Sequence, residues 1–176
     1  AIHGGHVKDQ FGSLATPIHQ TATFVFDSAE QGGRRFALEE GGYIYSRLGN
    51  PTNTQLEEKL AMLEGAEAAI STASGIGAVA SAFWTALKAG DHVVAAKTLY
   101  GCTYAYLNHG ISRYGVEVTF VDATNLEEVS RAMRENTKVV YLETPANPNL
   151  EVVDIEAISK IAHQNNDCIV MVDNTF

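Results

Sequence analysis

One short stretch decides the fold: Cys168-Ile169-Val170-Met171-Val172-Asp173-Asn174-Thr175-Phe176. Five apolar residues follow one another without a polar break and then meet a carboxylate, which is typical of a parallel strand buried on both faces. Open α/β sheets bind their ligands at the carboxyl ends of such strands. The stretch therefore predicts that Asp173 faces a ligand site, and the rest of the chain must show which ligand it is.

Strands and helices are predicted to alternate in front of this stretch. Apolar runs predict strands at 68–72, 92–96, 116–121, 139–142 and 168–172. Helical patterns lie between them, at 75–88, 103–113, 126–134 and 155–163. Alternation at this spacing implies βα units, so we predict an α/β fold with a mainly parallel sheet and helices on both faces.

The first part of the chain is expected to be an arm. Residues 1–48 lack sustained hydrophobic periodicity and are rich in glycine, threonine and aromatic residues. A segment of this length without its own pattern is more often packed on another body than free, although a partly disordered terminus is the alternative. A capping box at Thr54-Gln55-Leu56-Glu57 predicts the start of a helix, and Gly65 its end. We predict an arm at 1–48 that contacts a neighbouring subunit, and the front part of a large domain at 49–176.

Composition narrows the classes of function. The formal net charge is -9 and the lysines and arginines are scattered, which disfavours nucleic-acid binding. Cys102 and Cys168 are too far apart for a zinc-binding or disulfide pattern and suit a reducing compartment. No apolar run approaches the roughly 20 residues of a membrane span, and no signal-peptide pattern opens the chain. We expect a cytoplasmic protein without a metal site.

A turn that contains glycine is predicted to bind an anion. Ser74-Gly75-Ile76-Gly77 follows a predicted strand and opens a predicted helix, where backbone N–H groups and the helix dipole favour a phosphate. Extended to Ala80, the stretch also fits the Gly-x-Gly-x-x-Ala fingerprint of nicotinamide-dinucleotide-binding oxidoreductases. That alternative needs an acid about 20 residues further on, where Ala95-Ala96-Lys97 stands, although Lys97 could meet a 2′-phosphate. A tight turn without a ligand is the third interpretation.

Two side chains with reactive groups follow the predicted strand at 92–96. Tyr100 can stack on a flat ring or donate a proton. Cys102 lies close to a helix start, which favours a reactive thiolate. Packing alone is the alternative for both residues.

An amide and a carboxylate complete the set of polar groups at strand ends. Asn147 is fixed between Pro145 and Pro148, which suits a directional hydrogen bond, although Asn-Pro is also a turn signal. The four features are the phosphate-binding turn at Gly75, the aromatic ring of Tyr100, the amide of Asn147 and the carboxylate of Asp173. A planar, phosphorylated ring that contains nitrogen would bind to all four, and pyridoxal 5′-phosphate (PLP) is such a ring. PLP needs a carboxylate that keeps its pyridine nitrogen protonated, and Asp173 fits that need.

Five blocks of sequence resemble the trans-sulfuration, or Cys/Met metabolism, family of PLP-dependent enzymes. They are Tyr45–Thr52, Ala73–Ala78, Leu99–Gly101, Glu143–Pro148 and Val172–Thr175, and they stand in the order of the family. The resemblance covers essentially the whole chain. It implies PLP fold type I, with an incomplete large domain of the aspartate aminotransferase kind. It also implies subunits that pair as homodimers, within a homotetramer.

The resemblance implies a role for individual residues. Tyr100 would stack on the ring and protonate a leaving thiol, Asn147 would meet the 3-oxygen of the ring or the substrate carboxylate, and Asp173 would meet the ring nitrogen. Tyr45 and Arg47 would reach the phosphate from the neighbouring subunit. The implied cofactor-binding residues are Tyr45, Arg47, Ser74, Gly75, Ile76, Tyr100, Asn147, Asp173 and Thr175. The implied catalytic residues are Tyr100, Cys102 and Asp173.

The implied activity is that of a carbon–sulfur lyase. The expected reaction is α,γ-elimination from L-methionine or a related sulfur amino acid, which gives a thiol, ammonia and a 2-oxo acid. Cys102 favours the methionine branch, because cystathionine lyases and synthases of the family usually carry glycine there. Cystathionine γ-lyase, cystathionine γ-synthase and O-acetylhomoserine sulfhydrylase activities are the alternatives within the family. A third class of function is a non-catalytic module that associates with another subunit through the arm.

One part of the family's pattern is missing. Its members hold PLP as a Schiff base on a lysine in a Ser-x-Thr-Lys stretch after the aspartate strand. None of the lysines stands in such a stretch; they are Lys8, Lys59, Lys88, Lys97, Lys138 and Lys160. The arginine that binds the substrate carboxylate and the C-terminal domain are missing as well. We therefore expect the front part of a longer enzyme, inactive by itself.

Overall fold

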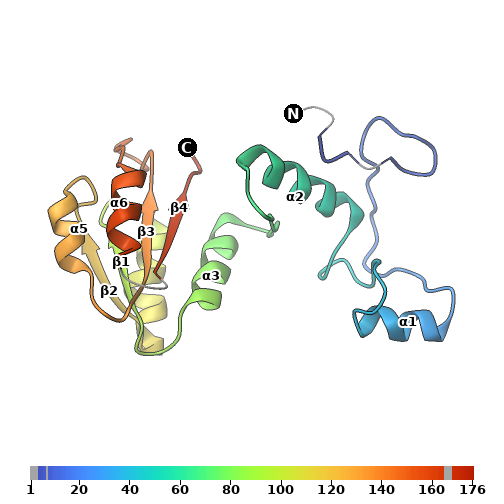
Figure 1. Ribbon diagram of the computed structural model, residues 1–176, viewed down its shortest axis with the longest axis horizontal. Coiled ribbons are helices and arrows are strands. Elements are labelled where there is room, and N and C mark those ends of the chain that lie inside the picture. The colour runs from blue at the N-terminus through green and yellow to red at the C-terminus, as the bar shows by residue number, and fades with distance from the viewer. Residues whose placement is uncertain (1–3, 7, 165–167) are drawn as a thin grey trace. The chain divides into compact units, whose positions relative to one another are not determined.

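A computed structural model describes residues 4–6, 8–164 and 168–176 of the chain. The chain divides into two compact units, Ala1–Thr72 and Ala73–Phe176 (Figure 1). Residues 1–3 and 7 of the predicted arm lie outside the described residues. The arm's contact with a neighbouring subunit stays a prediction.

The first unit contains two helices, α1 (Ala29–Phe36) and α2 (Pro51–Glu64). Helix α1 was not predicted from the sequence. It is a polar helix that Ser28 caps by accepting a hydrogen bond from Gln31 N at 3.1 Å. The predicted start of α2 at Thr54 is wrong. Asn50 caps the helix and accepts from Thr52 N at 2.9 Å, and a proline suits the first helical turn. Gly65 ends α2 in the left-handed conformation, as predicted.

The second unit is built on a four-stranded sheet that is parallel throughout, in the order β2-β1-β3-β4. The strands are β1 (His92–Ala96), β2 (Glu117–Val121), β3 (Thr137–Glu143) and β4 (Ile169–Asp173). The strand predicted at 68–72 is wrong, since residues 68–72 form no strand. They have no neighbouring strand to pair with in the part of the chain that the structure describes.

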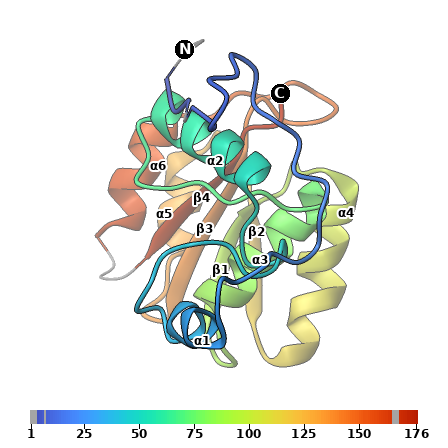
Figure 2. The ribbon, with the colours of Figure 1, turned by 90° about the vertical axis from the view of Figure 1, so that its right-hand side faces the viewer.

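Helices cover both faces of this sheet, as the alternation predicted. They are α3 (Gly75–Ala86), α4 (Gly101–Ala105), α5 (Leu126–Ala132) and α6 (Ile155–Ala162). Figures 1 and 2 show α5 and α6 on one face and α3 and α4 on the other. The helix predicted at 103–113 begins earlier and changes type, because α4 continues into a π-helical turn at Tyr106–Gly110 and a 3-10 turn at Ile111–Tyr114.

The core of the second unit lies on both sides of the two central strands. Every residue of β1 is buried, and β3 is buried at all but one position. By contrast, Val172 and Ile169 of β4 are exposed, so the prediction that this strand is buried on both faces is wrong. The reason is its place, since β4 forms an edge of the sheet among the described strands.

The burial of His92 makes the free energy of unfolding depend on pH. Its side chain is fully buried at the start of β1, and its Nδ1 and Nε2 each lie 2.8 Å from a threonine hydroxyl, of Thr137 and Thr119 respectively. Burial lowers the pKa of His92 from 6.5 to about 4. The unfolded chain therefore binds a proton at higher pH than the folded chain does. The stability that neutral, buried His92 contributes is fully present above pH 6.5, and it is lost as the pH falls towards 4.

We expect His92 to account for a loss of roughly 3 kcal/mol in the free energy of unfolding between pH 7 and pH 4. Urea denaturation across this range measures the loss. His92→Gln supplies the comparison, because an amide can still bond to the threonines but does not titrate. Equal pH slopes for the two proteins would show that His92 does not titrate as expected.

Candidate active site

A cavity of about 390 Å³ lies at the carboxyl edge of the sheet in the second unit. It is lined by eight of the residues singled out from the sequence, namely Ser74, Gly75, Ile76, Tyr100, Cys102, Asn147, Asp173 and Thr175. Val79, Thr103 and Glu143 also line it and were given no role from the sequence. The structure therefore gathers the predicted groups of this unit around one space.

The strand order explains why these loops meet. The chain passes from β1 outward to β2 and then returns to β3 on the other side of β1. Loops that follow neighbouring strands on either side of such a reversal leave a crevice at the carboxyl ends, where open α/β sheets bind ligands. The loop after β1 carries Tyr100, and the loop after β3 carries Asn147. The cavity thus lies where the fold class predicts a site.

The start of α3 provides donors for an anion. Ser74 caps the helix and accepts a hydrogen bond from Gly77 N at 3.1 Å. A helix gives its first N–H groups no acceptor of its own, so those of Gly75 and Ile76 are available to a ligand. A Cβ atom placed on Gly75 would have no neighbour within 4 Å, so there is room above this turn. The donors and the space both fit a phosphate group.

Asp173, the last residue of β4, has a fixed side chain. Its Oδ1 accepts hydrogen bonds from the backbone N and the Oγ1 of Thr175, at 3.2 and 2.6 Å. Its Oδ2 accepts from the phenol of Tyr141 at 3.2 Å. Because both oxygens are held, the carboxylate offers a defined position to a ligand in the cavity.

Tyr100 stands at the start of α4 with its side chain about half exposed. A hydrogen bond with Cys102 raises the pKa of the Tyr100 phenol. At neutral pH the phenol therefore keeps its proton, which suits a proton donor better than a base. Cys102 is exposed and lines the same cavity, next to this hydroxyl.

Glu143 organises the site, although it was given no role from the sequence. Its side chain is buried at the end of β3. Its Oε2 accepts from Tyr100 N at 2.6 Å and its Oε1 from Asn147 N at 2.8 Å. One carboxylate thus ties together the two loops that carry the aromatic and amide groups. Glu143 could have been predicted as a site residue by the pattern that indicated Asp173, which is a carboxylate at the end of an apolar strand.

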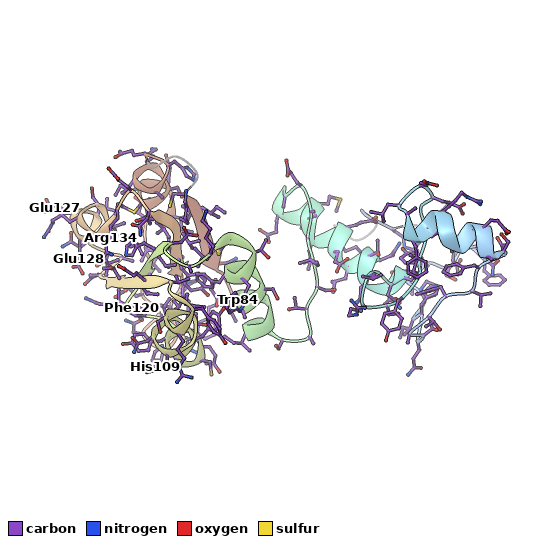
Figure 3. All side chains as sticks on the ribbon, turned by 90° about the horizontal axis from the view of Figure 1, so that it is seen from below. Trp84, His109, Phe120, Glu127, Glu128 and Arg134 are labelled. Carbon is purple, nitrogen blue, oxygen red and sulfur yellow. The ribbon has the colours of Figure 1, made fainter. Side chains whose placement is uncertain are left out.

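We expect Glu143→Gln to lower the free energy of unfolding by about 1–3 kcal/mol, because the new NH₂ group would face the backbone N–H of Tyr100 or Asn147 and leave it without this acceptor. Urea denaturation measures the change. Glu127→Gln is the matched control, since the Glu127 side chain is 87% exposed and projects outward from α5 (Figure 3). We expect the control to change stability by less than about 0.5 kcal/mol. Equal losses in the two variants would contradict the bridging role of Glu143.

Two predicted cofactor residues belong to the first unit. The guanidinium carbon of Arg47 lies 5.5 Å from the ring centroid of Tyr45, within the range of a cation–π contact. Arg47 makes no ion pair within the described residues, so its charge is available to an anion. Whether these two side chains reach a phosphate from a neighbouring subunit stays a prediction.

Lys97, the residue that the nicotinamide alternative needs, is already engaged. Its Nζ lies 2.6 Å from Asp122 Oδ2, and Lys97 does not line the cavity. This ion pair, led by its hydrogen bond, lowers the pKa of Asp122 to about 2. The pairing weakens the case for a 2′-phosphate at this strand end.

Within residues 4–6, 8–164 and 168–176, no cluster of three or more histidine, cysteine, aspartate or glutamate side chains is arranged to hold a metal ion. None of the helices there has the length and apolar character needed to cross a membrane.

Comparison with known sequences decides the family. Residues 1–176 match the family described as Cys/Met metabolism PLP-dependent enzyme. The chain belongs to this family. The resemblance found in the five sequence blocks is thereby confirmed, and so is the type I α/β fold of its second unit.

Individual members of the family are similar over the whole of this chain. The L-methionine gamma-lyase of Fusobacterium nucleatum is 69% identical over 176 residues, which are 100% of this chain and 45% of that protein. The L-methionine gamma-lyase of Porphyromonas gingivalis is 68% identical over 176 residues, or 44% of its length. The chain thus spans a little under half the length of these relatives.

A solved structure has the same fold as this chain. It is a putative O-acetylhomoserine (thiol)-lyase from Campylobacter jejuni, described with N′-pyridoxyl-lysine-5′-monophosphate. Its TM-score is 0.92 at 34% identity, and the match covers 98% of this chain and 42% of that one. Family membership favours the phosphate cradle of a PLP enzyme over the dinucleotide fingerprint as the interpretation of Gly75–Ala80.

Proposed function

We propose that this chain is the front, cofactor-binding part of a PLP-dependent carbon–sulfur lyase that carries out α,γ-elimination from L-methionine. The observation that carries the proposal is the make-up of the cavity, which is lined both by the start of α3 and by the fixed carboxylate of Asp173. An anionic phosphate and a cationic ring nitrogen are the two ends of PLP that such groups would bind. The names of the relatives at 68–69% identity support the choice of substrate.

The phosphate would be held mainly by backbone groups. The N–H groups of Gly75 and Ile76 would bind it at the start of α3, with the Ser74 hydroxyl beside them. Tyr45 and Arg47 would reach the same phosphate from a neighbouring subunit. A guanidinium can bind phosphate through two parallel hydrogen bonds, and this matters in a chain with a net charge of -9.

When bound, PLP supplies an electron sink for a carbanion at the substrate Cα. Asp173 would keep a proton on the ring nitrogen, because a fixed carboxylate stabilises the cationic form. Asn147 would hold the 3-oxygen of the ring or the substrate carboxylate by a hydrogen bond. Thr175 would act through Asp173, whose Oδ1 it holds.

Tyr100 would give the elimination its proton. The sulfur at Cγ leaves more easily as a thiol than as a thiolate, so a phenol beside it lowers the barrier. The raised pKa of Tyr100 keeps that proton available at neutral pH. Cys102, which raises this pKa, would adjust the strength of the acid and line the place of the substrate side chain. No lysine lines the cavity in the described part of the chain, so the residue that binds PLP covalently would come from elsewhere.

The alternatives within the family concern the sulfur substrate. Cystathionine γ-lyase, cystathionine γ-synthase and O-acetylhomoserine sulfhydrylase use the same cofactor chemistry, and the groups that hold PLP do not distinguish among them. We infer the methionine reaction from Cys102, which lines the cavity at a position where the cystathionine enzymes usually carry glycine.

We further propose that the protein assembles with copies of itself, as homodimer pairs within a homotetramer. The first unit has large apolar side chains that are almost fully exposed, such as Val25 at 93% and Leu38 at 91%. Exposed apolar groups in number are typical of a surface that a partner covers. The cytoplasmic location stays a prediction.

The proposal is tested with the complete protein, mixed with PLP and then with single substrates. We expect a visible absorption band on adding PLP, and production of a thiol, ammonia and a 2-oxo acid from L-methionine. Cystathionine and O-acetylhomoserine, tested in parallel, should be turned over more slowly. A protein that takes up no PLP would refute the function, and a preference for cystathionine would refute the choice of substrate.

A further inference from the structure

Tyr141 lies behind the cavity and has no role in the function proposed above. It belongs to β3, is 3% exposed, and packs against Phe83 with ring centroids 5.1 Å apart. Its hydroxyl donates to Asp173 Oδ2 at 3.2 Å and is also hydrogen bonded to the hydroxyl of Thr103, which is buried on α4. Packing alone does not explain a buried phenol whose hydroxyl donates to a residue of the cavity, because Phe would fill the same space without a polar group.

The hydrogen bonds to Asp173 leave few positions open. An ionised carboxylate has about four acceptor sites, two on each oxygen. The backbone N and the hydroxyl of Thr175 both donate to Oδ1 and use its capacity. Tyr141 uses one of the two sites on Oδ2. One acceptor site therefore remains, on the oxygen that Tyr141 holds.

We propose that Tyr141 is a positioning residue, which orients Asp173 so that one acceptor site on Oδ2 is left for the ring nitrogen of PLP. The proposal rests on the function proposed above and adds a residue to it. The hydrogen bond from the phenol fixes Oδ2 in one place. A carboxylate fixed opposite the ring nitrogen stabilises the protonated form of that nitrogen. Tyr141 would thus act through Asp173, without touching PLP.

Tyr106 shows what a tyrosine without this role looks like. Its ring also packs against Phe83, with centroids 6.1 Å apart. Its hydroxyl is buried and has no hydrogen-bond partner in the described part of the chain. Tyr141→Phe therefore removes a hydroxyl that donates to Asp173, whereas Tyr106→Phe removes a hydroxyl that makes no hydrogen bond within the described residues. This makes Tyr106→Phe a matched control.

The experiment uses the complete protein and PLP labelled with ¹⁵N in the pyridine ring. NMR reports directly whether the ring nitrogen is protonated, and a titration of the cofactor-free protein gives the affinity. In Tyr141→Phe we expect PLP to bind about tenfold more weakly, as for the loss of one hydrogen bond to a charged group. We also expect the ¹⁵N signal to move towards that of unprotonated pyridine. Tyr106→Phe should match the unchanged protein in both measurements.

The possible outcomes separate the two proposals. If the unchanged protein takes up no PLP, the proposed function fails and the role of Tyr141 fails with it. If it binds PLP and Tyr141→Phe shows the same affinity and the same ¹⁵N signal, only the role of Tyr141 is refuted. Thr103→Val removes the hydroxyl behind the phenol and should shift the ¹⁵N signal in the same direction, by less. If Tyr141→Phe does not fold, an unchanged signal in Thr103→Val overturns the proposal.

Discussion

Asp173→Asn is expected to lower kcat/KM for methionine elimination by between about a hundredfold and a few thousandfold. The amide has nearly the same shape, but it carries no charge to balance a protonated ring nitrogen. Removing one partner of a buried charge pair costs about 3–5 kcal/mol, which sets the range. Steady-state kinetics of the complete protein with L-methionine measures the effect.

The comparison for Asp173→Asn is Glu127→Gln, which makes the same chemical change on the exposed side of α5. Its kinetics should equal those of the unchanged protein. Asp173→Asn should also bind PLP more weakly, as seen by titration. A variant at Asp173 that keeps the full rate would remove this carboxylate from the site, and with it the reason for assigning PLP to the cavity.

Tyr100→Phe is expected to lower kcat by about 10²- to 10⁴-fold, the usual contribution of a general acid. The ring remains and can still stack, so the absorption band of bound PLP should stay. Tyr104→Phe, on the same helix, is the matched control, because its ring packs on Phe120 at 4.6 Å and does not line the cavity. An unchanged elimination rate in Tyr100→Phe would mean that another group protonates the leaving sulfur.

The sequence was most informative about buried strands and about helix ends, because both restrict which residues can occur. The buried run Val139–Leu142 predicted a parallel strand, because a strand covered on both faces has no polar positions. The apolar run before Asp173 also predicted a strand correctly, although Ile169 and Val172 of that strand are exposed. The start of α3 and the end of α2 were also predicted correctly. Serine is a preferred cap at the start of a helix, as Ser74 is, and glycine is a preferred residue just after the end of one, as Gly65 is.

The parts of the fold that escaped prediction depend on tertiary context or on polar caps. Helix α1 is polar and has few apolar residues, and its N-terminal cap, Ser28, makes a single side-chain hydrogen bond. The segment 68–72 has the composition of a strand but no partner strand within the described residues. Composition sets a propensity, and pairing decides whether a strand forms.

The site shows the same division. The ends of predicted strands and the start of the predicted helix at 75–88 indicated which side chains would gather, and the cavity brings eight of them together. The contacts that hold them were not predictable, because they join residues far apart in the sequence. Glu143 reaches back 43 residues to Tyr100, and Tyr141 reaches forward 32 residues to Asp173. No local pattern marks such pairs.

The most direct test of the proposed site is a crystal structure of the complete protein with PLP bound. We expect the phosphate oxygens within about 3 Å of the backbone nitrogens of Gly75 and Ile76, and the ring nitrogen at a similar distance from Asp173 Oδ2. A structure with the phosphate away from the start of α3, or with the ring nitrogen facing a group other than Asp173, would contradict the assignment of this cavity to PLP.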